Sequence, residues 1–253
     1  MTNMMDWPLL LFAVSLIALW LAAQTGSWWS RRGKLDADDQ ADLGVIVAAA
    51  LTLLGLIIGF TFSMAISRYN QRKDCEAAEA NAIGTEYARA GLLPAADAAR
   101  VRGLLTSYLS QRTSFYTTRD PRRLQQLKSS ESKLQNDLWA AVQSCATTDR
   151  SPVMALAVSG MNDVLNAQAY TQAAWWNRIP GAAWALMAAI AVCCSYLVGY
   201  TARHSERIRR FFVLPAIVSI AFLLIADIDS PHGGLILVRP QNLESVASSL
   251  PVP

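Results

Sequence analysis

Apolar residues are gathered into four long runs, at 7–23, 43–66, 182–200 and 211–228. A helix needs about 17–25 mostly apolar residues to cross roughly 30 Å of hydrocarbon. Each run has such a length and carries no Lys, Arg, Asp or Glu before its last turns. The pattern therefore predicts four transmembrane helices. The first run could instead be a cleaved secretory signal, but no Lys or Arg precedes it, which favours a retained anchor.

Between the second and third runs, hydrophobic residues recur at helical spacing within a more polar block, as in Val101, Leu104, Leu105 and Tyr108. Turn-forming segments that contain Pro94, Pro121 and Pro152 interrupt this block. The predicted helices therefore cover 67–91, 95–118, 121–146 and 152–178. Because strand patterns are absent, the predicted fold class is all-α.

The helix predicted from the second run has no stop signal where it leaves the bilayer. The segment FTFSMAISRYNQRKDCEAAEANA, residues 60–82, passes from apolar to charged without Gly or Pro. A helix from Val45 to Ala90 would be roughly 70 Å long, with about half of it outside the membrane. The soluble block is therefore predicted to prolong the membrane bundle. The predicted regions are two spans at 1–66, a soluble helical bundle at 67–181, two further spans at 182–228 and a tail at 229–253.

Composition agrees with a membrane protein, since 53% of the residues are hydrophobic and 16% are charged, against about 45–50% and about 25% in soluble domains. The net charge of +3 comes without a basic cluster of the nucleic-acid-binding type, so no nucleic-acid partner is expected. Nucleophile-elbow, phosphate-loop, dinucleotide and metal-ligand patterns are absent from the sequence, so neither an enzyme nor a cofactor is expected. A charge-coupled transporter is disfavoured because the runs lack ionisable residues until Asp227 and Asp229, although neutral-lined transport stays open.

The four cysteines do not suggest a metal site. Cys193 and Cys194 are adjacent in the third run, where apolar packing is favoured over a redox switch. The predicted helices place Cys75 and Cys145 about 20 Å or more apart, beyond the roughly 7 Å limit for a disulfide. Free thiols are expected.

Two stripes of residues spaced by four run along the second membrane helix. The small stripe is Gly55, Gly59 and Ser63, and the apolar stripe is Ile58, Phe62 and Ile66. Both can be ordinary packing surfaces, which is the commoner use for a single membrane helix. If several copies surround an axis, the small stripe packs against a neighbour and the apolar stripe forms rings that gate a pore by dewetting.

Three cations, Arg68, Arg72 and Lys73, follow directly beyond these stripes. One interpretation is that they extend to the lipid headgroups as interface anchors. In an oligomer they would instead form a ring of positive charge at the pore mouth, where anions would be concentrated. The sequence leaves both interpretations open.

Two segments carry a resemblance to a known family. LLGLIIGFTFSMAISRYNQRKDCEAAEANAIGTEYARAGLLP and IADIDSPHGGLILVRPQNL resemble the bacterial bestrophin-like family and, more distantly, the bestrophin anion channels. The resemblance implies four spans, long helices that reach into a soluble region, and a pentamer around the second helix. It also implies a neck of Ile and Phe at four-residue spacing, which the apolar stripe matches. A shifted alignment puts the small stripe there and makes a wider, less hydrophobic neck.

Bestrophins also carry an acidic stretch after the last span, which helps to bind calcium in calcium-gated members. Asp227 and Asp229, in DIDSPHGG, match that stretch and are candidate metal ligands. Calcium prefers six to eight oxygens, of which two carboxylates supply few. A helix stop with two interfacial acids and a Pro/Gly turn is the favoured alternative.

The leading functional hypothesis is an oligomeric anion-permeable channel, lined by the second membrane helix, in the bacterial inner membrane. Its expected partners are further copies of itself, membrane lipid and inorganic anions such as chloride. The competing hypothesis is a non-conducting membrane scaffold or sensor whose soluble helical bundle binds a partner. The loops SWWSRRGKLDADD and TARHSERIRR carry seven Lys and Arg, which by the positive-inside rule puts the soluble block outside the cytoplasm. The resemblance puts it inside, and that orientation is preferred.

Overall fold

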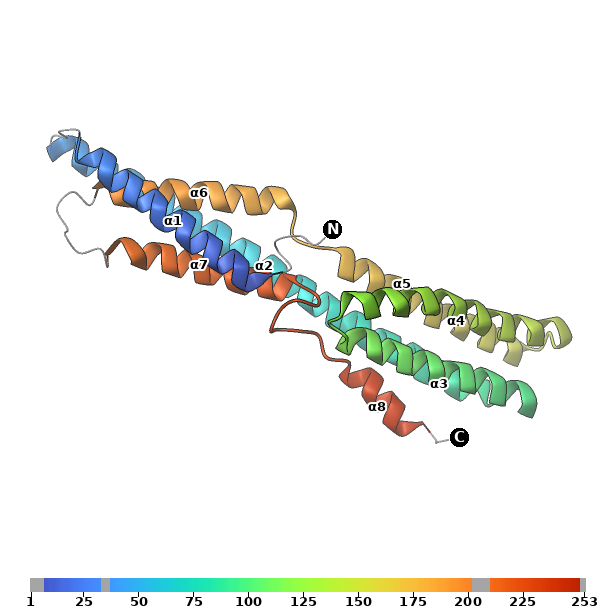
Figure 1. Cartoon of the computed structure of the whole chain (residues 1–253). Helices are drawn as coiled ribbons and strands as arrows, with labels where there is room; N and C mark the ends of the chain where they lie inside the picture. Colours follow the sequence, from blue (N-terminus) through green and yellow to red (C-terminus); the bar gives the residue numbers. More distant parts are fainter. Residues whose placement is uncertain (1–6, 33–36, 202–209, 251–253) are drawn as a thin grey trace. The chain divides into compact units, whose positions relative to one another are not determined.

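The structure is a computed structural model that describes residues 7–32, 37–201 and 210–250, with the backbone alone at 37–40 and 210–211. Its helices are α1 (Pro8–Ser30), α2 (Ala37–Ala90), α3 (Ala95–Thr117), α4 (Pro121–Thr148), α5 (Pro152–Trp176), α6 (Gly181–Thr201), α7 (Arg210–Asp229) and α8 (Gln241–Ser249). Figure 1 shows these helices in sequence colours. Strands are absent from the described ranges, and the all-α prediction is confirmed.

Four helical stretches are long and apolar enough to cross a membrane, as predicted: Pro8–Ser30, Ala41–Ala90, Pro152–Thr201 and Phe212–Asp229. The second of them contains far more residues than a bilayer needs. The helix α2 is continuous for 54 residues, whereas about 20 cross the hydrocarbon. Its apolar part ends at Ile66, so we expect the part from Ser67 onward to extend outside the membrane. The prediction of one continuous helix from Val45 to Ala90 is confirmed.

The chain divides into two compact units. The membrane unit comprises Met1–Arg68 and Arg178–Leu237, and the soluble unit comprises Tyr69–Asn177 and Val238–Pro253. The soluble unit thus contains the outer part of α2 together with α3, α4, α5 and α8.

Close approach of two backbones holds α1 against α6 in the membrane unit. A Cβ added at Gly26 would overlap the carbonyl oxygen of Tyr196, and one added at Gly199 would lie 2.9 Å from the Cα of Ala23. Small residues at such crossings let membrane helices gain van der Waals contact. Near the start of α6, Trp184 meets Phe222 of α7 edge-on, with ring centroids 6.0 Å apart.

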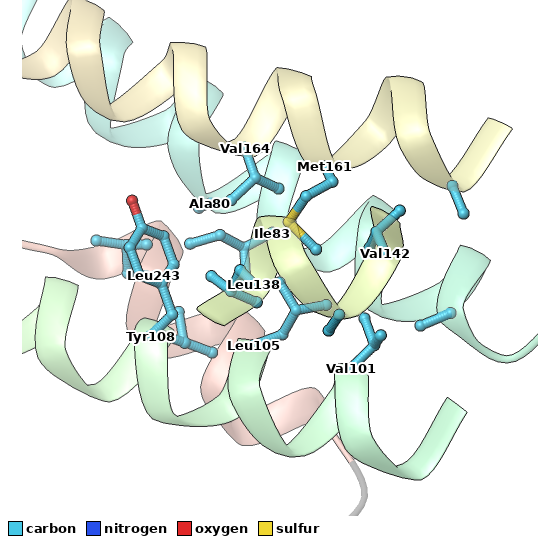
Figure 2. Packing of buried hydrophobic residues seen from close by; sticks show 14 of the residues in the cluster. Ala80, Ile83, Val101, Leu105, Tyr108, Leu138, Val142, Met161, Val164 and Leu243 are labelled. Atoms are coloured by element: carbon cyan, nitrogen blue, oxygen red, sulfur yellow. The ribbon is translucent and has the colours of Figure 1, made fainter. Parts of the chain in front are cut away.

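The soluble unit has one hydrophobic core, to which all five of its helices contribute (Figure 2). Ile83 of α2, Leu105 of α3 and Leu138 of α4 are fully buried there. Met161 of α5 and Leu243 of α8 are buried with them. Helical spacing of these core residues is the periodicity that predicted α3, α4 and α5 from the sequence.

Capping residues explain where α4 and α5 begin. The Asp120 carboxylate accepts a hydrogen bond from the backbone N–H of Arg122 at 2.9 Å. The Ser151 hydroxyl accepts one from the N–H of Met154 at 3.2 Å. Each cap precedes a proline at the first helical position, where proline is favoured because its missing N–H has no intrahelical partner. These turns lie where the sequence predicted them.

All four cysteines are free thiols, with Cys145 and Cys194 buried. Of the two loops whose charges bear on orientation, residues 33–36 and 202–209 lie outside the described residues.

Candidate pore helix and buried charge cluster

The membrane part of α2 has one face buried within its own subunit. Leu54 and Thr61 are each 2% exposed, and Ala65 is fully buried. Because successive residues turn by about 100° around a helix, these three positions lie on one side. That side faces the rest of the subunit.

The small stripe turns from the flank of the helix at Gly55 to the opposite side at Ser63. A Cβ added at Gly55 or Gly59 would meet nothing within 4 Å, and Ser63 is exposed. Around the helix, Gly59 and Ser63 lie about 140° and 180° from Leu54. The small stripe therefore has no packing partner among the described residues of a single subunit.

The apolar stripe lies between these two faces. Ile58 is half-buried, whereas Phe62 and Ile66 are 37% and 38% exposed. Ile58 lies only about 40° from Leu54, so the apolar stripe starts beside the buried face and turns away from it towards Ile66.

The three cations beyond the stripes differ in burial. Arg68, the last residue of α2 in the membrane unit, is half-buried and Lys73 is exposed. Arg72 is 3% exposed. They therefore do not present one uniform exposed row on the isolated chain.

A buried ionic cluster joins three helices of the soluble unit. The guanidinium of Arg112 on α3 donates from Nε and from Nη2 (3.2 Å) to the two carboxylate oxygens of Glu79 on α2. Its Nη1 donates to Oε1 of Glu131 on α4 at 2.5 Å. Arg112 is 2% exposed and Glu79 is fully buried. The cluster thus brings two carboxyl groups to one guanidinium inside the bundle.

Neutral groups complete the shell around this cluster. The hydroxyls of Thr171 on α5 and of Tyr116 on α3 donate to Oε2 of Glu79, at 3.1 Å and 3.4 Å. The Arg112 guanidinium also lies 4.6 Å from the ring centroid of Phe115, within the range of a cation–π interaction. All four long helices of the soluble unit therefore meet at Glu79 and Arg112.

The charges of the cluster perturb one another. Burial by itself lowers the pKa of Arg112, but Glu79 and Glu131 more than reverse this, so the guanidinium stays charged with a pKa above its ordinary value. Burial raises the pKa of Glu131, although Arg112 opposes the shift. Loss of Arg112 would leave both carboxylates without their counter-ion.

The sequence analysis missed this cluster, yet a signal was present. Arg112 continues the spacing of the buried stripe on α3 that contains Val101, Leu105 and Tyr108. An arginine on the core face of a helix has to be paired. The pattern does not identify its partners, which come from other helices.

Another buried carboxylate of α2 caps the C-terminal helix. Glu76, which is 1% exposed, accepts from the backbone N–H groups of Asn242 (3.0 Å) and Leu243 (2.9 Å) and from Nδ2 of Asn242 (2.6 Å). The residue before α8 is Pro240, which supplies no side-chain cap. Glu76 thus takes the place of an N-cap residue. The sequence analysis left α8 within the tail.

Asp227 and Asp229 both accept hydrogen bonds from backbone N–H groups. The Asp227 carboxylate accepts from Leu235 at 2.7 Å and Ile236 at 2.8 Å, so it closes the turn after α7. Asp229 accepts from Ile179 at 3.2 Å, just before α6. Groups of three or more His, Cys, Asp or Glu suited to a metal are absent from the described part of the chain.

Comparison with known families adds to this geometry. A model of the bestrophin-like domain matches residues 9–243, which is nearly the whole chain. The chain belongs to the bestrophin-like family.

Solved structures agree on the fold of this bestrophin-like chain. It is similar to the crystal structure of a bacterial bestrophin homolog from Klebsiella pneumoniae, with a TM-score of 0.61 at 14% identity over 96% of this chain and 99% of that one. A point variant of that homolog gives a TM-score of 0.62 at 14% identity over 95% and 96% of the two chains. A second point variant gives a TM-score of 0.58 at 15% identity, over 94% of this chain and 98% of that one. None of the curated proteins compared by sequence matches.

Proposed function

We propose that this bestrophin-like protein is an oligomeric anion-permeable channel whose pore is lined by α2. The observation that carries the proposal is the open face of α2 in the membrane unit, where a Cβ at Gly55 or Gly59 would meet nothing within 4 Å. Membrane helices use small residues where another backbone approaches or where a pore needs width. The proposed setting is the bacterial inner membrane, with the soluble unit in the cytoplasm and several copies of the chain around one axis.

Burial along α2 favours one of the two possible neck assignments. In a ring of α2 helices, the face that points to the axis is the one opposite the face packed into the subunit. Leu54, Thr61 and Ala65 mark the packed face, so Gly59 and Ser63 are proposed to face the axis. The apolar stripe is then proposed to pack towards the neighbouring α2, with Phe62 and Ile66 at the contact.

A neck lined by glycine and serine is wider and less hydrophobic than one lined by Ile and Phe. Dewetting would be weak in such a neck. The wild-type channel is therefore expected to conduct without any substitution that removes large apolar side chains. Preference for anions would then come from cations near the mouth, chiefly exposed Lys73, which attract anions most at low salt.

Chloride efflux from liposomes that contain the purified protein tests the proposal. Gly59→Leu should place a large side chain at the axis and reduce chloride efflux by about tenfold or more, with the oligomer intact by native mass measurement. Gly181→Leu is the matched control, because a Cβ at Gly181 also meets nothing within 4 Å but that residue begins α6. Its efflux should equal that of the wild type.

Two outcomes would contradict different parts of the proposal. If Gly59→Leu converts the oligomer to monomers, the small stripe is a subunit contact and the neck assignment is wrong. If the assembled wild-type protein passes no chloride, the channel proposal fails. The scaffold whose soluble bundle binds a partner would then be preferred.

A further inference from the structure

Glu86 is the least satisfied polar side chain of the soluble unit. It lies on α2 two turns beyond Glu79, is fully buried, and neither carboxyl oxygen has a hydrogen-bond partner among the residues that the structure describes. Glu76 and Glu79, on the same helix, each accept several hydrogen bonds. A buried carboxylate without such donors is strongly destabilised relative to its neutral form.

The carboxyl group of Glu86 fills the space beside a glycine of α5. A Cβ added at Gly160 would overlap Oε2 of Glu86 and would lie 2.5 Å from Nη1 of Arg89. The two helices therefore approach closely at this point, and the head of Glu86 lies within the contact. Any change in the volume or hydration of that carboxyl group acts directly on the packing of α5 against α2.

Two charged groups act on Glu86, one from each helix. Half-buried Arg89 on α2 and exposed Asp163 on α5 form an ion pair, with 4.0 Å between Nη1 and Oδ2. Burial raises the pKa of Glu86 to about 8, with Arg89 lowering it and Asp163 raising it. At neutral pH the carboxyl group is therefore mostly protonated in the folded protein.

We propose that Glu86 is a pH-responsive switch in the contact between α2 and α5: its neutral carboxyl group keeps the two helices packed at Gly160, and its ionisation in mildly alkaline solution loosens them. An ionised carboxylate needs water or donors that the closed contact lacks. Separation of α5 from α2 near Gly160 admits that water.

The sign of the pH dependence follows from linkage. The folded-state pKa of about 8 lies above the ordinary value near 4.5 of an unfolded chain. Between these two values the unfolded state has lost the proton while the folded state retains it, so stability falls as pH rises. Above about pH 8 the carboxylate is ionised in both states, and the folded protein then holds a negative charge within the contact between α2 and α5.

The helix that carries Glu86 also carries the small stripe, because α2 is continuous from Ala37 to Ala90. Loosening of the soluble part of α2 would thus act on the helix proposed to line the pore. This consequence rests on the proposed function. The switch itself does not, since its readouts below require no conduction.

Infrared difference spectra of the full chain in detergent, recorded from pH 6 to pH 10, give the direct test. A carbonyl stretch of a protonated carboxyl group should disappear with a midpoint near pH 8, and Glu86→Gln should lack this change. Glu244→Gln is the matched control, because Glu244 is an exposed acid of the same unit. It should retain the change unaltered.

Neighbouring residues identify the titrating group even if Glu86→Gln does not fold. Asp163→Asn removes a charge that raises the pKa of Glu86, so the midpoint should move to lower pH. Arg89→Gln removes a charge that lowers it, so the midpoint should move to higher pH. Opposite shifts identify Glu86, and equal or absent shifts contradict the assignment.

Hydrogen exchange then tests the consequence for packing. In the wild type, amide exchange in α5 around Gly160 should accelerate between pH 7 and pH 9 beyond the intrinsic chemical increase, and in Glu86→Gln it should not. An infrared titration without any change in α5 exchange would show an isolated buried acid and would overturn the switch. The absence of a carboxyl group that titrates near pH 8 would overturn the proposal at its first step.

Discussion

Replacing Arg112 by Met is expected to destabilise the soluble unit strongly. Met keeps a long apolar side chain but removes all three hydrogen bonds that join Arg112 to Glu79 and Glu131. Glu79 is then fully buried, and the donors left to it among the described residues are the hydroxyls of Tyr116 and Thr171. Removing one partner of a buried ion pair destabilises a protein by about 3–5 kcal/mol. For a chain of this size that corresponds to a fall in Tm of roughly 10 °C.

Thermal unfolding of the purified protein in detergent measures this loss. The matched control is Arg102→Met on the same helix, because Arg102 is half-buried and makes one hydrogen bond, from Nε to the carbonyl oxygen of Tyr87 at 3.2 Å. The Arg102→Met variant should lose about 1 kcal/mol of folding free energy. Adding Glu79→Gln and Glu131→Gln to Arg112→Met removes the uncompensated charges, so the triple variant should regain much of the lost stability.

The loss in Arg112→Met should also depend on pH. Without the guanidinium, only the weaker effect of Lys128 opposes the burial that already raises the pKa of Glu131, and the folded-state pKa lies above its unfolded value. Stability is then lost as pH rises through the window above the unfolded value, so the variant should be less impaired at pH 5 than at pH 8. A loss no larger than that of Arg102→Met, or one independent of pH, would refute the reasoning.

Two further predictions concern close contacts within each unit. Gly199→Val should lower the Tm because the new side chain overlaps the backbone at Ala23, at an overpacking cost of about 1–3 kcal/mol. Gly44→Val is the control and should leave the Tm unchanged, because a Cβ at Gly44 meets nothing within 4 Å. Equal Tm values for the two variants would contradict the α1–α6 contact. Glu76→Ala leaves the backbone N–H groups of Asn242 and Leu243 without their acceptor, and loss of such a cap destabilises a helix by about 0.5–2 kcal/mol. Amide exchange in α8 should therefore become faster, while exchange in α3 should stay as in the wild type. Unchanged exchange in α8 would show that its apolar contacts hold it without the cap.

Most of the secondary structure could be predicted from the sequence because it depends on local patterns. Apolar runs of membrane length predicted the spans, and hydrophobic residues at helical spacing predicted α3, α4 and α5. The run of helix formers beyond Ile66 predicted that α2 continues out of the bilayer. A helix satisfies its backbone hydrogen bonds within one segment, so these features require no knowledge of distant residues.

Partners that are distant in the chain depended on the tertiary structure. Glu79 and Arg112 are 33 residues apart, and Glu76 and Leu243 are 167 apart. The sequence places Glu76 and Glu79 on one predicted helix without identifying their partners, and it left α8 within the tail. The packing of the helices decides which buried acid pairs with a guanidinium and which caps a helix. It also decides that Glu86 has no hydrogen-bond donor among the residues that the structure describes. A side chain in low dielectric depends on the few atoms within hydrogen-bonding distance, and packing alone brings those atoms together.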